Sequence, residues 1–457
     1  MLDQTKEKKR RGCGVGTCLV WFALSLTALL LLLIVVFYGS FRSAEGLVRA
    51  ELKRIREAGE PTDDASMADW FRLQTHSAGT DAWKRILAQT ENLIATSPNV
   101  TVLPIVGAAE LPALLQPGDE WPAEPNVAEF LNAAKSVISS IEGTFAHPTP
   151  VWMPIEFKGY ETLLPEVQSA RQVSRLLRLE FVHAMYQQDG QRAKRALKSM
   201  KLCADAFDWQ TLMITDLVHT ALLGMYLGAL GKSLDADLWD ETDLVQFMEQ
   251  LSEPPDVSQR WNDVFAGERY WFLSESGDLG RLTGSPSGIP DTLMRLPYVR
   301  LKLLGASRRA QALGEGDLKT LVGRMQILET EIQNDINRMP YHPGNVAMSL
   351  LMPAHSAYAT SIERSEDGRR FIRTAVATKL FHFRNGRWPS ELSELEQLGV
   401  AQDDWSTLNF GPFGYSIEDN QAWLWSYSHS SQPDQIPATR PELVQENAGG
   451  MELLRIR

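Results

Sequence analysis

Two acid-x-x-histidine spacings are the sequence feature closest to catalytic chemistry. They are Glu180–His183 and Asp216–His219. On a helix, residues three apart share a face, and two such pairs in a bundle form half of a di-iron carboxylate site. Glu180 also lies on the apolar face of its helix, seven residues after Val173. One hypothesis is therefore an enzyme with a cleft site in a helical body, metal-dependent if these four side chains converge.

The competing interpretation makes the same four residues ordinary hydrogen-bonded or exposed polar groups. With 57 acidic residues and eight histidines in 457 positions, chance predicts about one such spacing, and two occur. Asp216 is shorter than the usual glutamate ligand, and no other predicted helix offers a matching pair. From the sequence we therefore assign no catalytic residue, no cofactor-binding residue and no metal ligand.

The elements that would position these residues are helices. Apolar residues recur with a period of 3.6 from about residue 165, and a second helix is predicted over 192–207 after the break at 187–191. The two helices should form an antiparallel pair. Cys203 lies on the apolar stripe of the second, which predicts a small buried side chain and not a reactive thiol. Residues 211–230 are apolar nearly all round, which indicates a central helix.

The same periodicity predicts helices elsewhere in the chain. A proline-rich stretch at 98–125 should be short and extended. The helix over 66–96 should be interrupted at 77–79, and the helix over 344–384 should break near 365–368. The other predicted helices are 44–61, 126–142, 236–252, 256–276, 290–312 and 317–338.

Residues 18–38 form an uncharged apolar run, CLVWFALSLTALLLLLIVVFY. As a helix, this run spans about 31 Å, close to the thickness of a bilayer's hydrocarbon core. No small-residue cleavage site follows it, so an uncleaved membrane anchor is predicted. Basic residues are packed into 6–11, whereas those after the run are spread among acids, which places the N-terminus in the cytoplasm and residues 39–457 outside.

The charge balance argues against a nucleic-acid partner. The chain carries a formal net charge of −12, and its first 38 residues carry five basic and two acidic side chains. The remainder is therefore strongly acidic, whereas binding to phosphates needs clustered Lys and Arg.

The stretch KLFHFRNGRWPSELSEL, residues 379–395, predicts a hinge. Asn385-Gly386 should end a long helix, with Gly386 at positive φ, and Trp388-Pro389 should turn the chain toward a short helix capped by Ser390. Trp388 should pack back on Phe381 or Phe383. Alternating residues then predict two short strands around 418–421. Trp388, Trp405, Trp423 and Trp425 form either the core of this cap or a binding patch.

The C-terminal element FRNGRWPSELSELEQLG, followed by GPFGYSI, resembles that of pilin-like and pseudopilin-like proteins. The whole chain also resembles a family of uncharacterised, single-pass, membrane-anchored bacterial proteins. The matching parts are ELKRIREAGEPT, LPIVGAAELP, DGQRAKRALKSMKLCADAF and GRWPSEL. A prepilin would have Glu at the fifth mature position, but Thr17-Cys18-Leu19-Val20-Trp21 follows Gly16, and 18–38 contains no Glu.

Together these features predict a mainly α protein with an N-terminal transmembrane helix, an extracytoplasmic antiparallel helical bundle or helix-pair array, and a small C-terminal α/β hairpin cap. The favoured function is a membrane-anchored protein-interaction or scaffold protein of the bacterial cell envelope, with a protein partner. The alternatives are the cleft enzyme and a pilus- or secretion-associated pilin-like subunit. The predicted segments are a basic tail at 1–17, the anchor at 18–38, juxtamembrane helices with the proline-rich region at 39–164, the helical body at 165–385, the cap at 386–430 and a tail at 431–457.

Overall fold

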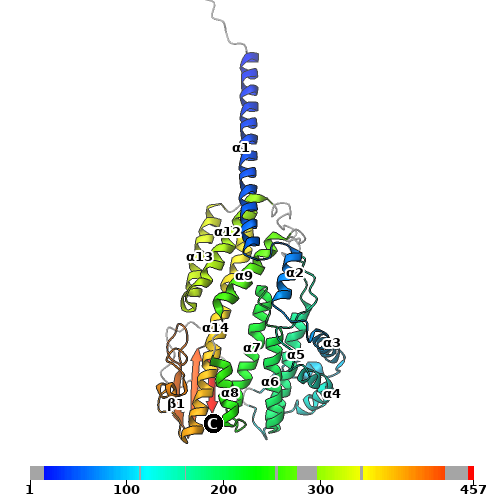
Figure 1. The fold of residues 1–457 in the computed structure, drawn as a ribbon, viewed down its shortest axis with the longest axis vertical. Helices are drawn as coiled ribbons and strands as arrows, with labels where there is room; N and C mark the ends of the chain where they lie inside the picture. Colours follow the sequence, from blue (N-terminus) through cyan, green and yellow to red (C-terminus); the bar gives the residue numbers. More distant parts are fainter. Residues whose placement is uncertain are drawn as a thin grey trace, which may run out of the picture.

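The computed structural model describes residues 15–112, 115–159, 161–252, 256–274, 296–339, 343–427 and 451–457. Most of these residues are helical, and a small antiparallel sheet lies near the C-terminus (Figure 1). The prediction of a mainly α chain with an N-terminal apolar helix and a small C-terminal sheet is therefore confirmed at that level. The predicted basic tail lies almost wholly outside the described residues.

Helix α1 (Val15–Glu57) is one continuous helix of 43 residues, where the sequence predicted an anchor and a separate helix. The chain contains no proline before Pro61, so nothing interrupts the backbone ladder. The outer half projects from the body (Figure 1), and its apolar side chains are exposed. The inner half packs into the body through Val48 and Ile55.

Two helices in the described part of the chain are long and apolar enough to cross a membrane. The first is the apolar part of α1, of which no residue in the most apolar window is buried, and the second is α7 (Met213–Ser233). Over half of the corresponding window of α7 is buried inside the body. We therefore treat α7 as the central helix of the body, as its sequence indicated.

The first helices of the body form its N-terminal part. The predicted interruption at 77–79 is present, since Gly79 takes a positive φ of 91° just before α3. Trp83 and Trp121 are buried in the core that these elements share with α5. The elements are α2 (Asp64–Leu73), α3 (Thr80–Thr96), the 3-10 helix η1 (Val100–Val102) and α4 (Glu124–Glu142).

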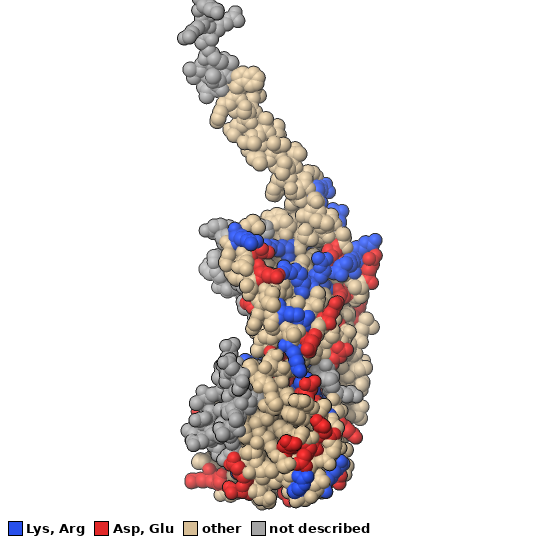
Figure 2. Space-filling model, turned by 90° about the vertical axis from the view of Figure 1, so that its left-hand side faces the viewer, with Lys and Arg blue, Asp and Glu red and all other residues tan. Residues whose placement is uncertain are grey.

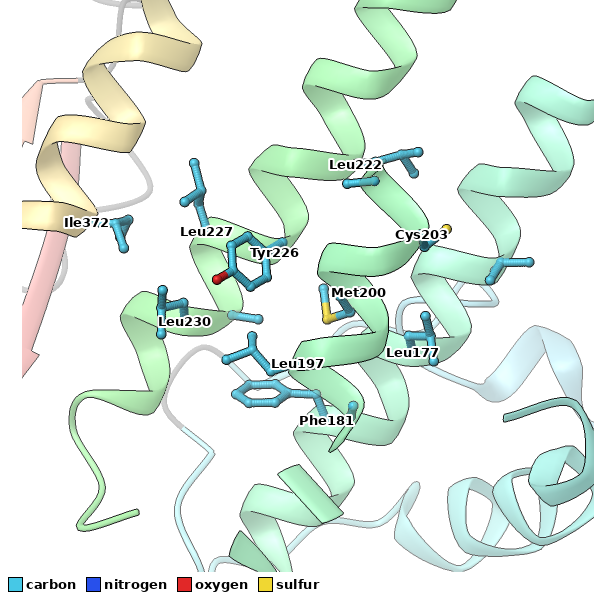
Figure 3. Packing of buried hydrophobic residues seen from close by; sticks show 14 of the residues in the cluster. Leu177, Phe181, Leu197, Met200, Cys203, Leu222, Tyr226, Leu227, Leu230 and Ile372 are labelled. Atoms are coloured by element: carbon cyan, nitrogen blue, oxygen red, sulfur yellow. The ribbon is translucent and has the colours of Figure 1, made fainter. Parts of the chain in front are cut away.

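Helices α5 (Pro165–Tyr186) and α6 (Gly190–Ala206) lie side by side and both pack on α7. Figure 3 shows side chains from all three helices meeting in one apolar cluster, among them Leu177, Met200 and Leu222. Cys203 is fully buried there, and burial raises the pKa of its thiol far above its usual value. Its prediction as a buried, unreactive side chain agrees with this placement.

The remaining helices complete the body. They are α8 (Glu241–Ser252), α9 (Val257–Leu273), α12 (Pro297–Ala312), the 3-10 helix η2 (Leu313–Glu315), α13 (Leu318–Arg338) and α14 (Pro343–Asn385). The predicted break of α14 near 365–368 is wrong. Glu366 bridges Arg369 and Arg370, three and four residues ahead, and these pairs run straight through the proposed break.

The C-terminal cap contains the 3-10 helix η3 (Leu392–Leu398) and strands β1 (Gly414–Glu418), β2 (Gln421–Tyr427) and β3 (Met451–Ile456). The predicted hairpin is present, with Glu418 opposite Gln421 and a tight turn at Asp419-Asn420. The third strand, β3, lies in the segment assigned to a tail, where it pairs with β2. Residues 428–450, which separate the two, lie outside the described residues.

The backbone of the hinge at Gly386 agrees with the prediction. Helix α14 ends at Asn385, Gly386 has a φ of 64°, and Trp388 is buried. The predicted partner of Trp388 is wrong, because its ring stacks on His382. Phe383 is half exposed, and the ring of Phe381 faces the guanidinium of Arg387.

Candidate functional site

The pair Glu180–His183 on α5 is held by structural contacts. Arg192, near the start of α6, binds the Glu180 carboxylate through Nε and Nη2. His183 Nε2 lies 3.0 Å from Oε1 of Glu124, at the start of α4. Each side chain therefore connects α5 to a neighbouring helix.

The pair Asp216–His219 on α7 belongs to a different network. Asp216 is fully buried and forms an ion pair of 2.5 Å with Arg260 on α9. Tyr358 on α14 donates its hydroxyl to the other carboxylate oxygen at 2.9 Å. Since three helices meet at one carboxylate, Asp216 is a structural anchor of the body.

The four residues named from the sequence do not form one site. Glu180 and Asp216 are each neutralised by a different arginine, and His183 and His219 have different partners. Among the residues that the structure describes, no group of three His, Cys, Asp or Glu side chains is placed to hold a metal ion. The metal-dependent form of the enzyme hypothesis is therefore not supported, because its geometric condition is not met.

His219 instead lines a cleft between α6, α7, α8, α9 and α14. The cleft has a volume of about 210 Å³. Its polar lining includes Lys201, Asp208, His219, Arg260, Glu366 and Arg369. Apolar side chains of α7, α8, α9 and α14 also line it, together with the polar side chains of Asp205, Thr220, Gln250 and Ser365. A concave site that combines a few charged groups with an apolar wall is typical of small-molecule binding.

Two oxygen atoms next to Nδ1 fix the orientation of the His219 ring in this cleft. Its Nδ1 lies 3.0 Å from the carbonyl oxygen of Ala204 and 3.4 Å from Oδ1 of Asp208. A carbonyl oxygen can only accept, so Nδ1 carries the proton and Nε2 has the lone pair. Burial lowers the pKa of His219 below its usual value, which keeps the ring neutral at pH 7.

The acidic and basic groups around His219 balance one another. Burial acts to raise the pKa of Asp208, but the charge of His219 in its protonated form and the charge of Arg260 hold it below its usual value. Asp208 lies 3.1 Å from Arg260, which therefore faces two carboxylates, those of Asp208 and Asp216. Asp208 therefore stays ionised next to this shared guanidinium.

Chemically, the cleft offers a neutral imidazole whose Nε2 can accept a hydrogen bond or a proton. The sequence analysis identified His219 but missed Asp208, Arg260 and Tyr358. No local signal marks them, since Tyr358 is 142 residues from Asp216 and lies on another helix. Only the packing of α7, α9 and α14 brings these side chains together.

No protein-family model, no curated protein and no solved structure matches this chain. The resemblance to pilin-like proteins therefore stays a prediction. The assignment of the cleft depends on its geometry alone.

Proposed function

We propose that the chain is a single-pass membrane protein of the bacterial cell envelope whose extracytoplasmic body acts as an interaction or scaffold protein. The observation that supports this proposal is the continuity of α1. The helix runs without a break from its exposed apolar stretch into the core of the body. A body joined to its anchor in this way keeps one orientation relative to the membrane. A fixed orientation suits a protein that presents a surface to a partner.

The junction between α1 and the body contains both apolar and ionic contacts. Val48 and Ile55 pack on Leu273 and Leu304 of α9 and α12. Just after α1, Glu60 pairs with Arg269 of α9, a guanidinium that is almost fully buried. These contacts hold the end of α1 from two sides, so the helix cannot pivot freely.

Charge around this junction fits a position close to a membrane surface. Figure 2 shows Lys and Arg side chains gathering at the end of the body nearest α1. Arg42, Arg49 and Lys53 on α1 are well exposed there, although each lies near a glutamate. Basic residues that flank an apolar span are common at membrane interfaces.

Membrane fractionation tests the anchor. The double variant Leu31→Arg/Leu32→Arg places two charges in the apolar stretch, where each costs roughly 2.5–3.5 kcal/mol of insertion free energy. We expect wild-type protein to stay in membranes washed at alkaline pH and the variant to be released. Leu47→Arg is the control, because Leu47 is exposed on the same helix beyond the apolar run. Equal extraction of all three proteins would overturn the proposal.

Orientation is tested separately with C-terminal reporter fusions to the full chain. An extracytoplasmic body should make fused alkaline phosphatase active and fused green fluorescent protein dark. The reverse pattern would place the body in the cytoplasm. The scaffold role is tested by crosslinking in intact cells, where a body that stays monomeric and uncrosslinked would argue against it.

A pilin-like subunit is the second candidate, and the cap is the feature that favours it. Helix α14, the turn at Gly386, the short helix η3 and the β1–β2 hairpin occur in the order of the resembling element. We propose that the chain nevertheless keeps its N-terminus, because 18–38 lacks the prepilin glutamate. N-terminal sequencing of protein from membranes should find the residues before Thr17. A mature protein beginning at Thr17 would favour the pilin-like subunit.

A further inference from the structure

His219, which lines the cleft, has one ring nitrogen to which no described residue makes a hydrogen bond. The His219 side chain is 7% exposed, and its Nδ1 is occupied by the Ala204 carbonyl. Among the described residues, none makes a hydrogen bond to its Nε2. A nitrogen with a lone pair, on a ring that lines a cleft, is a ready acceptor for a ligand's hydrogen bond.

The cationic groups around the cleft are already paired, which argues against an anionic ligand. Lys201 contacts Asp205 at 2.5 Å, and Arg369 contacts Glu366 at 2.8 Å. Arg260 is held by the two carboxylates described above. An anion would have to displace one of these carboxylates, and a cation would have to displace a guanidinium or ammonium group. An uncharged ligand disturbs none of the pairs.

Part of the lining of the cleft is apolar, next to the uncharged polar side chains of Thr220, Gln250 and Ser365. The apolar part is formed by Leu223, Leu227, Leu251, Val257 and Ile362, with the ring of Tyr226. Tyr226 donates a long hydrogen bond of 3.4 Å to Gln250, so its hydroxyl is occupied. At roughly 30 Å³ per water molecule, a volume of about 210 Å³ holds about seven waters. The ligand should therefore be small, with an apolar flank and one hydrogen-bond donor.

We propose that this cleft binds a small uncharged phenol or alcohol, whose hydroxyl donates to Nε2 of His219 and whose apolar flank contacts α7, α8 and α14. This binding site goes beyond the anchor and scaffold role and does not depend on it. The lowered pKa of His219 supports the assignment, because a protonated Nε2 could not accept.

The test uses two uncharged compounds that differ in one donor. These are 4-methylphenol, whose phenol hydroxyl is its single donor, and 4-methylanisole, in which a methyl group replaces that proton. Titration calorimetry of the full chain in lipid nanodiscs, with empty nanodiscs as the blank, should show the hydroxyl compound binding about tenfold more tightly, the ratio for one ordinary hydrogen bond. His219→Leu should bring the ratio close to one.

Two further variants separate a lost site from a lost fold. Leu223→Trp should fill the cleft and weaken binding of both compounds. His183→Leu, at the other acid-x-x-histidine position, should leave the ratio unchanged, because His183 contacts Glu124 elsewhere. Equal affinities in the wild type, no binding by either compound, or a preference that survives in His219→Leu would each overturn the proposal.

Discussion

The indole of Trp388 lies flat on the imidazole of His382, with ring centroids 3.9 Å apart and planes inclined by 11°. The same indole donates from Nε1 to the carbonyl of Asn420, 2.9 Å away in the β1–β2 turn. One side chain thus connects the last turn of α14 to the hairpin. Trp388 therefore shares the joining of the cap to α14 with other contacts, such as the ion pair of Arg373 with Asp404 and the edge contact of Phe371 with Phe413.

The first prediction concerns this ring. Trp388→Ala removes a buried aromatic side chain and should lower the free energy of unfolding by roughly 3–5 kcal/mol. Because the lost contacts join the cap to α14, limited proteolysis should cut near residue 386 while the helical body survives. Phe383→Ala is the control, since this neighbouring ring is half exposed. Identical digestion of both variants would show that the ring does not hold the cap.

The second prediction separates backbone strain from crowding at Gly386. A Cβ built on this residue would meet no other atom within 4 Å, but its φ is 64°. Gly386→Val should therefore destabilise the protein by about 1–3 kcal/mol through backbone strain alone. Gly368→Ala is the comparison, because this glycine lies inside α14 with open space around it. That change should stabilise by roughly 0.5–1 kcal/mol. Thermal unfolding of the full chain in detergent measures both, and effects of the same sign would contradict the argument.

The hinge shows what local sequence can predict. Asn385-Gly386 and Trp388-Pro389 act through backbone preferences, so the helix end and the positive φ were predictable. The ring partner was not, because the indole could reach several aromatic groups of the last helical turns. Local geometry does not choose between Phe381, His382 and Phe383.

Elements stabilised by distant contacts were harder to predict. Strand β3 contains only six residues, and its pairing partner β2 precedes it by a long segment. The predicted break in α14 used Ser365 and Gly368 as signals, but ion pairs and packing outweigh the weak helix propensity of these two residues. The residues of the site differ in the same way. The acid-x-x-histidine spacing identified His219 as a candidate, whereas only tertiary packing brings Arg260 close to it.

The third prediction concerns the junction between α1 and the body. Arg269 is almost fully buried between Glu60 and Gln311. Arg269→Met removes the guanidinium next to Glu60, which keeps a hydrogen bond of 3.2 Å from Gln311. The change should cost about 3 kcal/mol, the low end for a broken buried pair, because Glu60 is partly exposed. Hydrogen exchange should speed up in residues 48–57 of α1. Arg49→Met, a well-exposed change on α1, should leave exchange unchanged. Unchanged exchange in Arg269→Met would mean that apolar packing alone holds α1.

The fourth prediction distinguishes the buried ion pair of the cleft from an exposed one. Asp216→Asn leaves Arg260 with one carboxylate and should cost roughly 3–5 kcal/mol, because Asp216 is fully buried. Asp205→Asn breaks the pair with Lys201, which is a third exposed, and should cost less than about 1 kcal/mol. Urea denaturation of the two variants measures the difference. Similar midpoints would show that Asp216 is not an anchor of the body.

The last prediction is a pH dependence carried by Glu268 on α9. This side chain is buried and accepts a hydrogen bond of 2.8 Å from the backbone N–H of Met213, the first residue of α7. Burial raises the pKa of Glu268 from 4.5 to about 7. Between these two values the folded state binds more protons than the unfolded state. The stabilising contribution of Glu268 is therefore fully present below pH 4.5 and is lost as the pH rises through 7.

A second buried group opposes this trend, so the wild-type pH profile alone cannot isolate Glu268. Burial lowers the pKa of His355 on α14 from 6.5 to about 4, and its contribution to stability grows as the pH rises between these values. The pH dependence of the unfolding free energy must therefore be compared between the wild type and a variant that lacks the Glu268 carboxyl. Glu268→Gln keeps an oxygen for the Met213 N–H but cannot titrate. The difference in unfolding free energy, wild type minus variant, should fall by about 3 kcal/mol between pH 4.5 and pH 8. Glu129→Gln, at an exposed position on α4, should show no such change. A flat difference for Glu268→Gln would mean that Glu268 has the same pKa in the folded and the unfolded protein, and that burial does not raise it.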